Sequence, residues 1–367
     1  MSHLNILGIR GVPAMHGGFE TFAERLSLYL VGRGWTVTVY CQENGIESDK
    51  SWTSEWRGIQ RIHIPVKRTG ALGTVVFDFL AARHALTQPG LFLTLGYNTA
   101  IFNVLQRAKG QVNLFNMDGI EWRREKWSLV AKAWFWLNER FGCWVGNHLI
   151  ADHPEIKAHL QTRVSASKIT MIPYGGENVI EADREIIASY GLIQNQYSIV
   201  IARPEPENSI LEMVRAFSRK RRNHSLVILG AYDKSANQYH KKILDAASDE
   251  VLFLGAIYDS QVVQALRFYS RCYLHGHKVG GTNPSLVEAL GAGCAVIAHD
   301  NKFNRWVAGD SAEYFQDEDG FSNSFDKILS DNALLEKMKL GSKSMFMDKF
   351  TWNDILGQYE KLLCKWL

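Results

Sequence analysis

The sequence has little of what marks several classes of protein. Its five cysteines are odd in number, scattered and without CxxC spacing, which argues against a disulfide framework and a zinc site. No apolar run approaches the roughly 20 residues that span a bilayer. The net charge of +3 is too small to predict nucleic-acid binding. The first residues, MSHLNILGIR, pass directly into a strand pattern, so we expect no signal peptide and a cytoplasmic protein with reduced thiols.

Patterns for cofactors and metals are missing as well. The loop after the first predicted strand, GIRGVPAMHGGFETFAERL, lacks GxGxxG, so a nicotinamide or flavin site is not supported. No Asp-x-Asp pair lies in a metal-binding context, and there is no cluster of His and Cys. We therefore expect no cofactor and no bound metal.

Short apolar runs that alternate with longer amphipathic segments predict an α/β fold with parallel sheets. The predicted boundaries are 1–175 and 176–349 for two Rossmann-like domains and 350–367 for a final helix, whose apolar residues fall at helical spacing. The expected strands are 4–9, 36–41, 61–66, 91–96, 111–116 and 148–152 in the first domain, and 198–202, 225–230, 251–255, 272–275 and 295–299 in the second.

The stretch from Cys272 to Asp300 reads as strand, glycine-rich loop, helix and strand. Ser285 is free to cap the helix, with Pro284 just before it. Such a loop brings backbone N–H groups and a positive helix end to one place, which suits a phosphate. Glu288 lies one turn inside the helix, where a neutral hydroxyl such as that of a ribose is the better partner. The alternative is an ordinary βαβ turn with glycines for tight packing.

Two places in the first half carry polar residues at predicted strand ends. Gly17 and Gly18 open the first helix and permit close approach of a ligand, with Arg10 and His16 nearby; a glycine turn without a ligand is the alternative. After the fifth predicted strand, Asp118 follows Asn116. A lone Asp there is also typical of a turn.

Residues 121–144 combine five tryptophans with several Lys and Arg in one predicted helical region. One interpretation is a core helix whose tryptophans pack inward, with a solvated basic face. The other is a cationic, aromatic surface that rests on an anionic membrane, where lipid-linked acceptors are found.

The stretch HxVGGTNPSLxEAxG, together with the first loop and the tail, resembles family-4-type retaining glycosyltransferases of the GT-B fold, and within them bacterial polysaccharide rhamnosyltransferases. Glu288 and the following ALGAGCAVI match the second half of that family's donor motif. The motif's first carboxylate position is Gly280, which departs from the pattern. The resemblance implies two Rossmann-like domains facing a central cleft, a tail helix that crosses back to the first domain, and transfer with retention.

The resemblance also implies roles for individual residues. Arg203 resembles the Arg of the family's diphosphate clamp, GR-x-x-x-x-K, but the Lys is missing at Asn208 and Ser209. Lys278 is a candidate for the lost charge, and a solvated lysine is the alternative. The expected catalytic residues are Asp118, Arg203 and Lys278; the acceptor side is Arg10, His16 and Asn116; the donor-binding residues are Gly17, Gly18, Arg203, His277, Gly280, Gly281, Thr282, Asn283, Ser285, Leu286 and Glu288.

The sequence thus indicates an enzyme that moves a sugar from a nucleotide-diphosphate donor to a saccharide or lipid-linked saccharide of a bacterial polysaccharide. The resembled subgroup points to L-rhamnose from dTDP-L-rhamnose. Two alternatives stay open. One is an epimerase or hydrolase of nucleotide sugars on the same fold, for which Asp118 alone is thin support. The other is an inactive binding subunit, suggested by Gly280 and the missing Lys.

Overall fold

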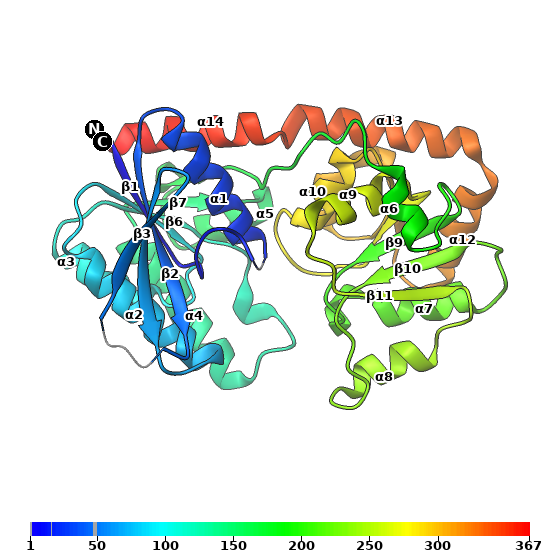
Figure 1. The fold of residues 1–367 in the computed structure, drawn as a ribbon, viewed down its shortest axis with the longest axis horizontal. Coiled ribbons are helices and arrows are strands. Elements are labelled where there is room, and N and C mark those ends of the chain that lie inside the picture. Colours follow the sequence, from blue (N-terminus) through cyan, green and yellow to red (C-terminus); the bar gives the residue numbers. More distant parts are fainter. Residues whose placement is uncertain (1, 16, 47–49) are drawn as a thin grey trace. The chain divides into compact units, whose positions relative to one another are not determined.

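The computed structural model describes residues 2–15, 17–46 and 50–367, which divide into two compact units (Figure 1). Unit 1 comprises Met1–Pro173 and Trp352–Leu367, and unit 2 comprises Tyr174–Thr351. Each unit is a parallel sheet covered by helices, so the predicted α/β class is confirmed.

Unit 1 is built on an eight-stranded sheet of order β3-β4-β2-β1-β5-β6-β7-β8, in which only β3 runs antiparallel to its neighbour. Its strands are β1 His3–Leu7, β2 Thr36–Asn44, β3 Trp52–Trp56, β4 Ile59–Val66, β5 Leu91–Leu95, β6 Asn113–Asn116, β7 His148–Ala151 and β8 Ile169–Met171. Its helices are α1 Gly18–Val31, α2 Gly70–Ala85, α3 Val104–Ala108, α4 Leu129–Val145, α5 Pro154–Gln161 and α14 Trp352–Leu363, with short 3-10 turns η1 Ala100–Asn103, η2 Glu121–Arg123, η3 Ala166–Lys168 and η6 Cys364–Trp366.

The tail helix α14 completes the core of unit 1. Its Tyr359 is buried, with its ring centroid 4.6 Å from that of Phe22 on α1, and its hydroxyl accepts a hydrogen bond of 2.9 Å from the Asn116 amide at the end of β6. The apolar residues at helical spacing from Ile355 to Leu363 are buried as the sequence predicts.

Unit 2 contains a six-stranded parallel sheet of order β11-β10-β9-β12-β13-β14. Its strands are β9 Tyr197–Ile201, β10 Ser225–Leu229, β11 Val251–Gly255, β12 Cys272–His275, β13 Ala295–His299 and β14 Glu313–Phe315. Its helices are α6 Arg184–Ser189, α7 Ile210–Ser218, α8 Gln238–Asp245, α9 Ser260–Phe268, α10 Pro284–Gly291, α11 Lys302–Ala308, α12 Glu318–Ser330 and α13 Asn332–Lys349, with 3-10 turns η4 Pro206–Asn208 and η5 Gly309–Ser311.

Both faces of the unit 2 sheet are buried, because successive side chains of a strand point to opposite faces. On β12, Tyr273 joins the core under α9 and α10, and Leu274 joins the core under α7 and α12. A sheet covered on both faces reads as continuous apolar runs, which explains why its long strands are evident from the sequence.

Candidate functional site

The strand order of unit 2 places β9 next to β12. From β9 the next strands are added toward one edge of the sheet, and from β12 they are added toward the other edge. Ligands of doubly wound sheets bind at this switch point, outside the carboxyl ends of the strands. The loop after β9 contains Arg203, and the loop after β12 contains residues 276–283, which we call the donor loop. The predicted clamp residue and the predicted phosphate loop therefore lie on neighbouring strand ends.

The base of the donor loop packs tightly on the loop after β9. A Cβ at Gly276 would lie 2.1 Å from the carbonyl oxygen of Asn208, so only glycine fits there. The N–H of Lys278 donates to the carbonyl of Glu207 over 2.9 Å. The amide of Asn208 donates to the carbonyl of Arg203 over 2.8 Å, so the residue that stands near the family's missing Lys is built into the turn.

The N-terminus of α10 differs from the predicted one. Asn283, not Ser285, is the N-cap, and its side chain accepts the N–H of Ser285 over 3.0 Å. The N–H groups of Leu286 and Val287 bond to the Asn283 carbonyl, each over 3.1 Å. The first N–H groups of the helix are thus already satisfied. The Leu286 side chain is in the core and does not line the site.

Glu288 is fixed by a partner that the sequence does not indicate. Its Oε2 lies 2.7 Å from Nη2 of Arg267 on α9, whose side chain is only 5% exposed, whereas that of Glu288 is 35% exposed. The same Nη2 donates to the Ser285 hydroxyl over 3.0 Å. A charged hydrogen bond to a buried guanidinium holds the carboxylate in one orientation. The ion pair uses Oε2 and not Oε1.

A chain of hydroxyls extends this network into the sheet. The Tyr273 hydroxyl donates to the Ser285 hydroxyl over 2.8 Å, and the latter donates to the Ile201 carbonyl at the end of β9 over 3.3 Å. His275 is fully buried, and its ring stacks on that of His277 with centroids 4.3 Å apart. Burial, followed by the neighbouring imidazoles of His277 and His299, holds the pKa of His275 well below its usual value. His275 is therefore neutral at pH 7.

The two predicted cations are both exposed at this edge. Arg203 is exposed in the loop after β9. The Lys278 ammonium lies 3.3 Å from a carboxylate oxygen of Glu212 on α7. An exposed ion pair of this kind is weak, so Lys278 can exchange Glu212 for a phosphate at little cost.

Gly280 has a backbone φ of 145°, a conformation that side chains rarely adopt. A Cβ built on it would meet no atom within 4 Å. The backbone conformation at this position therefore disfavours the glutamate that the resembled family has there, and the space around Gly280 is open. Gly281 is half-buried and Thr282 is buried in the same loop.

In unit 1, the structure places the predicted residues at the ends of β1 and β6. Arg10 is exposed and Gly17 is the N-cap of α1 with φ 87°, while Gly18 begins the helix. His16 lies outside the described residues. The Ala14 N–H donates to a carboxylate oxygen of Glu24 on α1 over 2.7 Å, which ties this loop to the helix.

Asn116 at the end of β6 and Asp118 just after it make hydrogen bonds that stabilise the fold of unit 1. Asn116 is buried, donates to Tyr359 and accepts the N–H of Asp118 over 3.1 Å. Asp118 has a left-handed backbone with φ 51°, as the turn interpretation predicts. Its side chain is half-buried next to this turn.

Helix α4 has the reverse of an ordinary amphipathic pattern. Its buried positions include Asn138 and Glu139, while Leu129 and Val130 are 85% and 82% exposed. Trp136, Leu137 and Trp144 are exposed as well. The tryptophans of the helix do not all pack inward, so the core-helix interpretation is wrong for this face. Because Ser128 caps α4, residues 121–128 are a separate segment and not part of one long helix.

Cations accompany the aromatic rings of this region. Arg140 lies 3.5 Å from the Trp136 ring centroid, Lys126 lies 4.8 Å from that of Trp127, and Arg123 lies 5.1 Å from that of Trp122. Burial acts to raise the pKa of Glu139, but hydrogen bonds from His159, Trp122 and Arg163 outweigh it and hold that pKa below its usual value. Glu139 is thus a buried, ionised carboxylate, whereas Arg123 is exposed.

Helix α2 contacts η1, as α4 does, and it also has exposed apolar residues. The N–H of Ile101 donates to the Asn138 side chain of α4 over 3.0 Å, and the Thr99 hydroxyl donates to Asp78 of α2 over 2.7 Å. The exposed apolar residues of both helices, which we call the α2/α4 surface, are Leu72, Val76 and Phe79 of α2 and Leu129, Val130, Trp136 and Leu137 of α4.

Within the described residues, no group of His, Cys, Asp and Glu has the arrangement of a metal site. The helices of this part of the chain are too short or too polar to cross a bilayer.

Comparison with known proteins gives two family matches. Residues 1–177 match a family described as a domain of unknown function (DUF1972), and residues 183–345 match glycosyl transferases group 1. No curated protein was matched by the sequence.

Solved structures share the fold over the full chain at low identity. Sucrose-phosphate synthase from Thermosynechococcus elongatus is 16% identical with a TM-score of 0.83, covering 100% of this chain and 99% of that one. Anabaena HepE in complex with UDP is 12% identical with a TM-score of 0.75, and an alpha,alpha-trehalose-phosphate synthase (UDP-forming) from Burkholderia vietnamiensis is 11% identical with 0.76, each covering 100% of both chains. These structures show that the chain has the GT-B fold that the sequence predicts, and the match to glycosyl transferases group 1 is confined to residues 183–345.

Proposed function

We propose that this protein is a glycosyltransferase that uses a nucleoside-diphosphate sugar and transfers a 6-deoxyhexose, L-rhamnose from dTDP-L-rhamnose, to a saccharide or lipid-linked saccharide of a bacterial polysaccharide, with retention. The observation that carries the donor site is the pairing of Glu288 with buried Arg267 beside the donor loop. It fixes the carboxylate of Glu288 on α10, the helix that follows the loop at the switch point of the doubly wound sheet. The UDP complex of HepE supports a nucleotide at this fold.

Charge that develops on the leaving diphosphate needs fixed positive partners. Arg203 is exposed on the loop after β9, and its planar guanidinium suits phosphate oxygens. The backbone of Gly280, Gly281, Thr282 and Asn283 and the ammonium of Lys278 are the other candidates. Asp118 after β6 is our candidate for the reaction centre, and Arg10, His16 and Asn116 are those for the acceptor side. Gly17 and Gly18 are candidates for donor binding.

The preference for a deoxy sugar rests on Gly280. Where the resembled family places a carboxylate, this chain has open space and a backbone that disfavours a side chain. A buried carboxylate without a hydroxyl partner is costly, so its removal suits a sugar that lacks a hydroxyl there. We therefore expect dTDP-L-rhamnose to be used better than UDP-glucose.

We further propose that the α2/α4 surface rests on an anionic membrane that carries the acceptor. Exposed Leu, Val, Phe and Trp suit the interface, and Arg123 beside Trp122 and Lys126 beside Trp127 suit anionic head groups. The double variant Leu129→Ser/Val130→Ser should reduce co-sedimentation with vesicles that contain phosphatidylglycerol. Leu340→Ser, at another exposed leucine, is the matched control. Equal sedimentation of both variants would refute the contact.

One assay separates the proposed reaction from its alternatives. The protein is incubated with dTDP-L-rhamnose, UDP-glucose, UDP-galactose and GDP-mannose, with and without a lipid-linked saccharide, and release of nucleoside diphosphate is measured. Release that requires the acceptor supports a transferase. Release without acceptor indicates a hydrolase, conversion of the sugar without release an epimerase, and binding without turnover an inactive subunit.

A further inference from the structure

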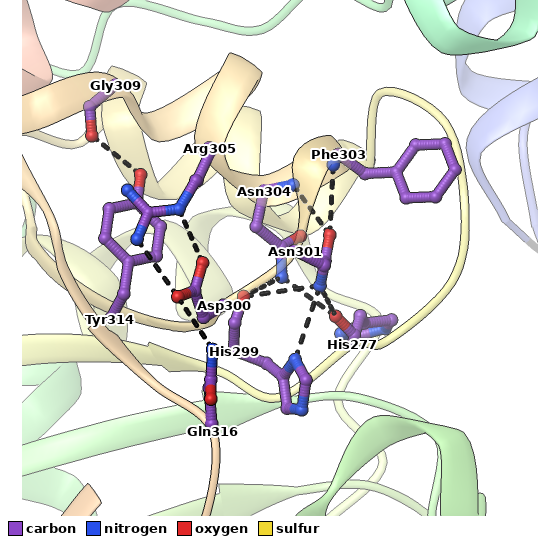
Figure 2. Close-up of polar contacts among 10 residues, drawn as sticks. All are labelled: His277, His299, Asp300, Asn301, Phe303, Asn304, Arg305, Gly309, Tyr314 and Gln316. Carbon is purple, nitrogen blue, oxygen red and sulfur yellow. Dashed lines mark hydrogen bonds and ion pairs between the residues drawn. The ribbon is translucent and has the colours of Figure 1, made fainter. Parts of the chain in front are cut away.

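The peptide unit between His277 and Lys278 is held at both ends by side chains and backbone of neighbouring loops. Its N–H, that of Lys278, donates to the Glu207 carbonyl in the loop after β9. Its carbonyl, that of His277, accepts two hydrogen bonds from amide side chains of the segment after β13, 2.9 Å from Asn301 and 2.8 Å from Asn304 (Figure 2). Because a peptide unit is planar, contacts at both ends fix its orientation.

Asn304 is suited to hold two loops together. It is buried on α11, and its single Nδ2 donates to the carbonyls of both His277 and His299, each over 2.8 Å. The two carbonyls belong to the segments that follow β12 and end β13. An amide has two N–H donors, so this pairing uses the full donor capacity of the group.

Asn301 has a different double role. Its Oδ1 accepts the N–H groups of Phe303 and Asn304, each over 3.0 Å, which makes it the N-cap of α11. Its Nδ2 donates to the His277 carbonyl over 2.9 Å and also to the His299 carbonyl over 3.3 Å. Capping requires only the oxygen, so the nitrogen is available for the donor loop.

The helix that carries both residues is itself anchored. Arg305 donates to both carboxylate oxygens of Asp300 and lies over the ring of Tyr314, whose hydroxyl donates to the Gly309 carbonyl (Figure 2). The Gln316 amide also donates to Asp300. These contacts surround both ends of α11, so Asn301 and Asn304 are presented by a supported element.

We infer that Asn301 and Asn304 are positioning residues for the donor: they fix the His277–Lys278 peptide and thereby the path of the donor loop toward the diphosphate. This role rests on the proposed function of that loop. Neither side chain needs to touch the donor. Losing one of the two donors to His277 leaves the peptide held less firmly, and the cost appears as weaker donor binding.

The test uses Asn301→Asp, because aspartate keeps the cap oxygen and adds a negative charge that is favourable at the helix start, while it removes the Nδ2 donor. Asn237→Asp is the matched control. Asn237 caps α8 of the same unit in the same way, accepting from Tyr239 and His240, and is exposed. Both variants add one negative charge, and only the first removes a bond to the donor loop.

Two measurements are compared in wild type and both variants. In the ligand-free protein, amide hydrogen exchange of residues 276–283 should become at least several-fold faster in Asn301→Asp only. By calorimetry, the Kd for dTDP or UDP, whichever the wild type binds, should rise about tenfold in Asn301→Asp and less than twofold in Asn237→Asp. The donor KM should rise in parallel. A merely structural role would lower the active fraction, and hence the apparent kcat, at unchanged Kd and KM.

If exchange of residues 276–283 is unchanged in Asn301→Asp, the Asn301 side chain does not hold the donor loop. If exchange is faster but the Kd stays within twofold of wild type, this contact has no role in donor binding. If the wild type binds neither dTDP nor UDP, the proposed function of the loop fails and this role with it. The exchange data still report separately whether Asn301 holds the loop.

Discussion

Replacing Glu288 by alanine should weaken the fold as well as the binding of the donor. The substitution leaves the guanidinium of Arg267 buried without its carboxylate. Removing one partner of a fully buried pair costs about 3–5 kcal/mol. Because the Glu288 side chain is 35% exposed, water can reach part of the site, and we expect about 2 kcal/mol.

That loss can be measured as a melting temperature. For a unit of this size, 1 kcal/mol lowers Tm by about 2–4 °C, so Glu288→Ala should unfold about 4–8 °C below the wild type. Glu288→Gln retains an oxygen that can accept from Arg267 and should lose about 1 kcal/mol. Both are followed by thermal unfolding under circular dichroism.

Glu336→Ala is the control for loss of a carboxylate from an exposed helix. Glu336 lies on α13, 3.3 Å from Lys339, and its side chain is 66% exposed, so its loss should change stability by less than about 0.5 kcal/mol. In calorimetry, Glu288→Ala should also weaken binding of the nucleoside diphosphate by tens-fold, measured below the Tm. An unchanged Tm would refute the buried pairing, and an unchanged Kd would refute the ribose assignment.

Four further outcomes follow from the sequence and the structure. Activity should survive EDTA, because in the proposed site Arg203 and backbone dipoles stabilise the diphosphate; loss with rescue by Mg²⁺ or Mn²⁺ would reveal a metal site. Truncation after Phe350 should give insoluble protein, since it exposes the α14 face of unit 1, and a soluble, active product would contradict the packing. The kcat/KM for dTDP-L-rhamnose should exceed that for UDP-glucose, and preference for any fully hydroxylated hexose would refute the role of Gly280. Burial lowers the pKa of His224 to about 4, so between pH 6.5 and 4 the unfolded state binds a proton that the folded state does not, and stability falls as pH falls through this range; His224→Gln should flatten this part of a Tm–pH curve, and an equal slope would contradict it.

The strands that carry the site, β9, β12 and β13, were predictable because each is a continuous apolar run buried on both faces of the sheet. The strands missed are β3, β8 and β14. Trp52–Trp56 forms an exposed edge strand without an apolar run, and Ile169–Met171 and Glu313–Phe315 are three residues each. Their pairing is decided by the neighbouring strand and not by their own composition.

Within the site, the sequence predicted which segments carry the candidate residues, but not which side chains those residues contact. Glu288 and the donor loop follow from local pattern. Arg267 lies 21 residues before Glu288 on another helix, and Asn304 looks like one more polar residue in a short helix; both acquire their roles only when β12 and β13 bring their segments together. Ser285 was a reasonable cap by composition, but Pro284 at the first helical position makes Asn283 the cap.

Unit 1 is made of two pieces of chain, and this fixes the order in which the protein can be completed during synthesis. Unit 2 is continuous from Tyr174 to Thr351 and can fold once those residues have been translated. Unit 1 is begun first, yet Phe22 and Asn116 lack Tyr359 until α14 has been made. The nascent first unit must therefore wait, with part of its core uncovered, while the whole second unit is translated, and it is in this interval that we expect its dependence on chaperones to be greatest.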